Sequence, residues 1–102
     1  MNRSERVITA LNGLAREKVR NMKGTGGDKA PDGLSWKAWW EKNSNKKFDL
    51  CSCCGSKAED GSHVKKVNVD DRSCYIVPLC HKCNESPDPI DVNSGDLVLF
   101  IP

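Results

Sequence analysis

The sequence contains no long apolar run. No window of its 102 residues approaches the roughly 18 to 20 consecutive apolar residues that a membrane-spanning helix needs. Residues 1–30 also lack the apolar stretch of a secretory signal peptide. The length matches one domain of modal size and argues against a second. We therefore expect a single domain over residues 1–102 that is soluble and cytoplasmic and makes no membrane contact.

A strong net charge is also lacking, because the formal total is only +2. The charges are nevertheless uneven along the chain. Through Lys47, eleven Lys and Arg stand against five Asp and Glu, whereas from Phe48 onward five stand against nine. The first part is therefore at +6 and the second at −4. This asymmetry favours a nucleic-acid partner for the basic part, while the weak total keeps a protein partner open.

Residues 1–23 have the pattern of a basic amphipathic helix. Their apolar residues recur at helical spacing and share one stripe: Val7, Ile8, Leu11, Leu14, Ala15, Val19 and Met22. The stripe would either pack against the domain or face a partner. If the partner is nucleic acid, phosphate contacts would come chiefly from this segment, at Arg3, Arg6, Arg16, Lys18, Arg20 and Lys23. Lys42, Lys46 and Lys47 would add to them.

A second helix is predicted after a break in the chain. Residues 24–33 hold four glycines and a proline, which predicts a flexible loop. Residues 34–47 then fit a helix capped by Ser35, with three tryptophans on one face: Trp36, Trp39 and Trp40. We expect these tryptophans to form core rather than an exposed platform for stacking bases.

The last part of the chain, residues 48–102, has β-type patterns around its cysteines. Residues 62–79 are rich in β-branched residues on both sides of a short polar turn and predict a β-hairpin. The tail "GDLVLFIP" is apolar on both faces of a strand, so it needs burial, and we expect it to pair with the hairpin.

Two CxxC pairs dominate this part: Cys51 with Cys54, and Cys80 with Cys83. Each pair can offer two thiolates to one ion, and Zn²⁺ takes four tetrahedral ligands. The 25 residues between the pairs are close to the common spacing of such sites. We predict one structural zinc ion per chain, with no open position for catalysis. A redox role for a CxxC would need a βαβ unit, and a disulfide scaffold would need a secreted protein.

Two cysteines are left over by this pairing. Cys74 begins a predicted strand and is most simply a small buried residue, whereas Cys53 either points outward or contributes a thiol to the zinc shell.

These residues resemble a known group of proteins. A CxxCG knuckle, a hairpin with His63 and a closing "LCHKCN" are similar to treble-clef zinc fingers of the HNH nuclease group, over residues 48–86. The same pattern resembles short bacterial and phage proteins with a "GSHV" segment and "YIVPLC". The resemblance implies that the four paired cysteines ligate zinc, that His63 is the general base of an endonuclease and that Asn84 binds its catalytic metal.

The chain departs from the nuclease pattern at the positions that support catalysis. HNH proteins carry a metal-binding residue just before the base, where this chain has Ser62, a poor ligand for a hard cation. The residue that orients the base is also missing, and Pro87 and Pro89 would shorten the last helix. Phosphodiester cleavage needs a Lewis acid, so we expect His63 to be structural.

The sequence thus predicts an α+β protein in which two helices precede a treble-clef-like zinc module of knuckle, β-hairpin, short helix and closing strand. Its expected function is binding, of nucleic acid or a protein partner, without catalysis. The alternative is a diverged HNH-type endonuclease that uses His63 and Asn84.

Overall fold

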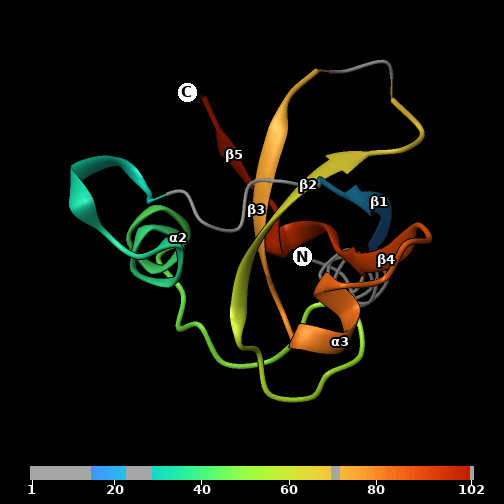
Figure 1. Cartoon of the computed structure of the whole chain (residues 1–102), viewed down its shortest axis with the longest axis horizontal. Helices are drawn as coiled ribbons and strands as arrows, with labels where there is room; N and C mark the ends of the chain where they lie inside the picture. The colour runs from blue at the N-terminus through green and yellow to red at the C-terminus, as the bar shows by residue number, and fades with distance from the viewer. Residues whose placement is uncertain (1–14, 23–28, 70–71, 102) are drawn as a thin grey trace, which may run out of the picture.

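The computed structural model describes residues 15–22, 29–69 and 72–101. The elements in chain order are β1 (Arg16–Asn21), the 3-10 turn η1 (Pro31–Gly33), α2 (Trp36–Ser44), β2 (Asp60–Lys66), β3 (Cys74–Leu79), α3 (His81–Asn84), β4 (Ile90–Asn93), the 3-10 turn η2 (Ser94–Asp96) and β5 (Val98–Phe100) (Figure 1). The predicted α+β class is confirmed. Within the described residues no helix is long and apolar enough to cross a membrane.

The strands form one antiparallel sheet in the order β4-β1-β2-β3-β5. The predicted hairpin is confirmed as β2 and β3, where Ser62 lies opposite Val77 and Val64 opposite Tyr75. The apolar tail is strand β5, which pairs with β3 as expected. Residues Ile76 to Leu79 of β3 are all buried, because Ile76 belongs to the core on one face of the sheet and Val77 and Leu79 belong to the core on the other.

The helix expected over residues 1–23 is wrong for Arg16–Asn21, which form strand β1 between β2 and β4. Val19 is fully buried there, and the residues beside it alternate between the two faces of the sheet. Helix propensities differ by less than about 1 kcal/mol per residue for these residue types, so two flanking strands outweigh them. Residues 1–14 and 23 of that prediction lie outside the described residues, as do residues 24–28 of the predicted loop.

Helix α2 lies within the predicted range and begins after the predicted cap, Ser35. The Ser35 hydroxyl accepts a hydrogen bond from the amide of Ala38 (3.0 Å), and the helix ends at Asn45 in the left-handed conformation. Trp39 and Trp40 are buried, which confirms them as core. Trp40 also donates its indole N–H to the carbonyl of Asp96 (2.9 Å), so the helix is tied to the end of the chain.

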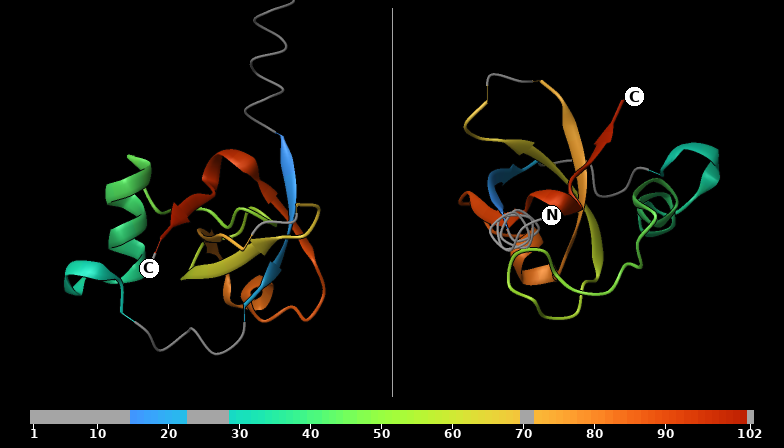
Figure 2. Two further views of the ribbon diagram at one scale, coloured as in Figure 1. Left: turned by 90° about the horizontal axis from the view of Figure 1, so that it is seen from above. Right: turned by 180° about the vertical axis from the view of Figure 1, so that it is seen from behind.

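The two faces of the sheet carry separate cores. On the aromatic side, Trp39 and Trp40 of α2 form a core with Phe48 and with Ile76 of β3. On the cysteine side, the core consists of small aliphatic residues and two cysteines: Val19, Val64, Val77, Leu79, Val92, Cys51 and Cys80. Helices α2 and α3 consequently lie on opposite sides of the hairpin, as two views of the ribbon show (Figures 1 and 2).

Candidate metal centre

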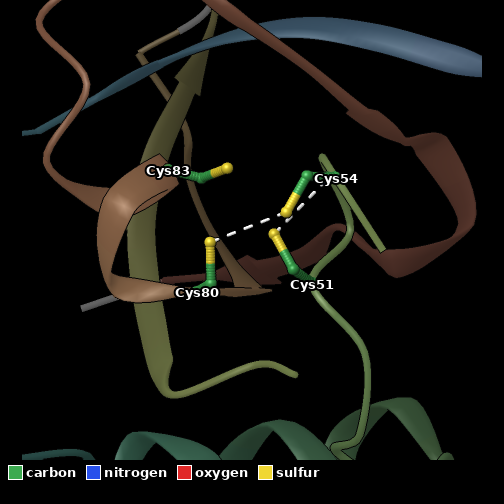
Figure 3. A group of neighbouring side chains, drawn as sticks. All are labelled: Cys51, Cys54, Cys80 and Cys83. Atoms are coloured by element: carbon green, nitrogen blue, oxygen red, sulfur yellow. Dashed lines mark hydrogen bonds between the residues drawn. The ribbon is translucent and has the colours of Figure 1, made fainter. Parts of the chain in front are cut away.

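The first cysteine pair lies in a tight knuckle before β2. The amide of Gly55 donates to the carbonyl of Cys51 (2.9 Å), and the amide of Cys51 donates to the carbonyl of Ser56 (2.6 Å). Gly55 has a φ of 81°, a left-handed conformation that glycine adopts without steric cost. The knuckle thereby turns the chain back, and the side chains of Cys51 and Cys54 lie next to each other (Figure 3).

The second pair stands at the end of β3. Cys80 is the N-cap of α3, and the amide of Asn84 donates to its carbonyl (3.0 Å), which closes a single helical turn. Residues three apart lie on the same face of a helix. The turn therefore presents the thiols of Cys80 and Cys83 toward the knuckle (Figure 3).

The four sulfur atoms converge. All lie within 4.8 Å of one another, and the Sγ atoms of Cys54 and Cys80 are 3.7 Å apart. Four thiolates about 2.3 Å from one ion at tetrahedral corners would be about 3.8 Å from each other. The described cysteines are free thiols, without a disulfide. This group can hold a metal ion with little movement of the sulfurs.

The thiols differ in how readily they lose a proton. The pKa of Cys54 is lowered to about 6, chiefly by a hydrogen bond from the Ser56 hydroxyl (3.0 Å). The pKa of Cys80 is lowered by the amide of Cys83. Burial raises the pKa of Cys51 and of Cys83. An ion that needs four thiolates must therefore displace protons from the latter two, so its affinity will fall as the pH is lowered.

Neither remaining cysteine belongs to this group. Cys53 is half-buried and packs against the core of the cysteine side. Cys74 is half-buried at the start of β3, the strand position expected for it. Cys53 therefore lies beside the four-cysteine group without belonging to it.

His63 and Asn84 line the same open groove, of about 990 Å³, which lies at the beginning of β2 between α2 and α3. His63 itself is only 8% exposed, and its ring meets that of Trp36 edge-on at 4.4 Å. Asn84 donates to the Asp60 carboxylate on the cysteine side (3.2 Å). The structure brings the two residues to one groove, from opposite faces of the sheet.

Asp60 and His81 are polar residues of this groove region that the sequence analysis missed. Asp60 lies 3.3 Å from Nδ1 of His81, and this contact is the main cause that raises the pKa of His81. Asp60 stands two residues before Ser62 and so shares its face of the strand. That spacing was the signal that could have placed Asp60 on the α3 side.

Two buried oxygen atoms on the cysteine side have no hydrogen-bond partner among the described residues: Oγ of Ser62 and Oδ1 of Asn21. The amide nitrogen of Asn21 donates to the carbonyls of Cys83 and Ser86 (3.0 and 3.3 Å). Asn21 thereby ties β1 to α3. Ser62, just before His63, does not supply the metal-binding side chain that the nuclease pattern has at that position.

The basic residues singled out from the sequence have different surroundings. The guanidinium of Arg16 donates to the Asn93 side chain and to two carbonyls. Lys18 pairs with Asp91 (3.5 Å), and Lys46 with Asp96 (3.3 Å). Arg20 is exposed on β1. Arg3, Arg6 and Lys23 lie outside the described residues.

Comparison with protein-family models, with curated proteins and with solved structures finds no match to this chain. The resemblance to treble-clef and HNH proteins therefore rests on the motif residues alone.

Proposed function

We propose that this protein is a zinc-stabilised module that binds nucleic acid without cutting it. The observation that carries the proposal is the convergence of Cys51, Cys54, Cys80 and Cys83 within 4.8 Å. Tetrahedral sulfur sites take zinc or iron, and a closed four-thiolate zinc site is structural. α3 has only four residues and would not persist without a tertiary anchor. Zinc supplies that anchor by joining α3 to the knuckle.

Elemental analysis of the purified chain tests the metal directly. We expect one zinc per chain and no iron above trace. Iron in equal amount, with the absorption bands of an iron–thiolate centre, would contradict zinc as the resident metal but leave the four ligands in place.

Nucleic acid is favoured over a protein partner because basic residues gather before Lys47 and several stand on one face of β1. If phosphates are contacted, the logarithm of the affinity should fall with the logarithm of salt concentration, by about 0.9 per contact on duplex DNA and about 0.7 on single strands. Fluorescence anisotropy over a salt series measures this slope. Undetectable binding at low salt would contradict nucleic acid and leave a protein partner as the remaining reading.

The second candidate, an HNH-like endonuclease, is favoured by one observation: His63 and Asn84 line the same groove. Against it, Ser62 cannot supply a metal ligand, and His63 is largely enclosed by Trp36 and the strand. We expect no nicking of supercoiled plasmid with Mg²⁺ or Mn²⁺. Nicking by the wild-type chain that is lost in His63→Ala and kept in Lys57→Ala would establish the nuclease instead.

A further inference from the structure

The aromatic side of the sheet carries a row of cations beyond the area covered by α2. Arg16, Lys18 and Arg20 are alternate residues of β1 and share one face. Arg20 lies opposite Lys65 of β2, and Lys65 shares its face with His63, which contacts Trp36 of α2. The row is therefore on the same side as α2. Helix α2 packs over β2, β3 and β5, while Arg20 and Lys65 are exposed.

The cross-strand pair Arg20–Lys65 places two positive charges directly opposite each other. Side chains directly opposite each other on one face have Cβ atoms about 5 Å apart, and like charges there destabilise a sheet. Among the described residues, none with a carboxylate forms an ion pair with either of them. The neighbouring pair is matched instead: Lys18 lies opposite Asp91 and bonds to it. A pair of facing cations fits a site for an external anion.

Three of these cations, Lys18, Arg20 and Lys65, are spaced so that one sugar–phosphate backbone can contact them together. Lys18 and Arg20 are two residues apart on one strand, about 6.6 Å, and Lys65 stands beside Arg20. The Lys18–Asp91 ion pair is about half-exposed at both ends, and such a pair contributes little to stability, so Lys18 can exchange its partner for a phosphate. Arg20 also lines the groove and makes the row continuous with it.

We propose that Lys18, Arg20 and Lys65 form a phosphate-binding surface for the sugar–phosphate backbone of nucleic acid, running from β1 to the mouth of the groove. This inference rests on the proposed function and adds the surface that performs it. Charges of this kind position a backbone and do not read bases. Three acidic residues of the groove, Glu59, Asp60 and Glu85, all contact His81 of α3. They would keep the phosphates on the β1 side.

The test is charge reversal at the facing pair. Arg20→Glu combined with Lys65→Glu should weaken binding of a labelled oligothymidylate and of a duplex of equal length by more than tenfold at low salt. The salt slope should fall by about two contacts, near 1.8 on the duplex and 1.4 on the single strand. Preference between the two probes tells whether the backbone is taken from single or double strands.

The matched control is Lys29→Glu with Lys57→Glu, which changes the net charge equally at exposed positions outside β1 and β2. It should keep most of the affinity. The double glutamine variant Arg20→Gln, Lys65→Gln removes the repulsion, so it should melt at or above the wild-type temperature and still bind weakly. A wild-type chain that binds neither probe would overturn the proposed function itself. Strong wild-type binding that both charge-reversal variants reduce equally would overturn only this surface.

Discussion

The two sides of the sheet are stabilised by different means. On the aromatic side, a nine-residue helix buries two tryptophans against Phe48 and Ile76. On the cysteine side, a four-residue helix and a knuckle cover mostly valines. Burying a side chain of valine size contributes about 1.5 to 3 kcal/mol, and the large aromatic residues bury more area each. The aromatic side can therefore rely on packing, whereas the knuckle and α3 need another bond.

This difference explains where the cysteines are. The paired cysteines lie in the knuckle and at α3, and the group of four sulfur atoms brings these two short segments together. Structural zinc in small fingers contributes on the order of 10 to 16 kcal/mol of apparent binding free energy. That is as large as the whole stability of a typical domain, about 5 to 15 kcal/mol, so the proposed zinc ion would be enough to take the place of core on this side.

Removal of the metal should have the largest effect. A strong chelator should sharply lower the denaturation midpoint, and the amides of the knuckle and of α3 should lose protection in hydrogen exchange first. Re-addition of Zn²⁺ should restore both. Unchanged protection of these amides in metal-free protein would show that packing alone holds the cysteine side.

Trp40→Ala should break the aromatic side without touching the metal. The side chain is 2% exposed, and truncation of a buried tryptophan costs about 3 to 5 kcal/mol. We expect a much lower denaturation midpoint with zinc content unchanged. Leu99→Ala, at a residue 46% exposed, is the control and should change stability little. Loss of zinc in folded Trp40→Ala would mean that the two sides are not separable.

Gly61→Ala tests the close approach of α2 to β2. A Cβ at Gly61 would lie 2.7 Å from Cβ of Trp36, so helix and strand must move apart. Overpacking of this kind costs about 1 to 3 kcal/mol. Denaturation should report that loss, while Gly95→Ala, whose Cβ would meet only the end of the Lys46 side chain at 3.5 Å, should be tolerated. Equal stabilities of the two variants would contradict the tight packing.

Ser35→Ala should have the smallest effect. It removes the hydrogen bond to the amide of Ala38, and loss of such a cap costs about 0.5 to 2 kcal/mol. Ser35→Asp restores an acceptor and should recover most of the stability. A variant as stable as wild type would show that α2 is held by its tryptophans alone.

The features that the sequence predicted well are local ones. The CxxC spacing led to the ligand group, the Ser35 cap to α2, and two β-branched runs around a polar turn to the hairpin. The pairing of the tail with the hairpin also followed, because an apolar strand must be covered.

The features that were missed depend on partners far away in the chain. β1 has one buried aliphatic residue, Val19, and its strand conformation comes from β2 and β4, more than forty residues later. The contact of Asp60 with His81 needs α3 to fold back over β2. The enclosure of His63 needs Trp36 from another element. No local pattern contains these contacts.

The measurement that tests the central claim most directly is the zinc content of single cysteine variants purified in parallel. Cys51→Ser, Cys54→Ser, Cys80→Ser and Cys83→Ser should each lose the metal or hold it far more weakly against a chelator, because each removes one of four thiolates. Cys53→Ser and Cys74→Ser should keep one zinc per chain. Full zinc retention by Cys80→Ser, under chelation that leaves the wild type loaded, would contradict the four-cysteine site.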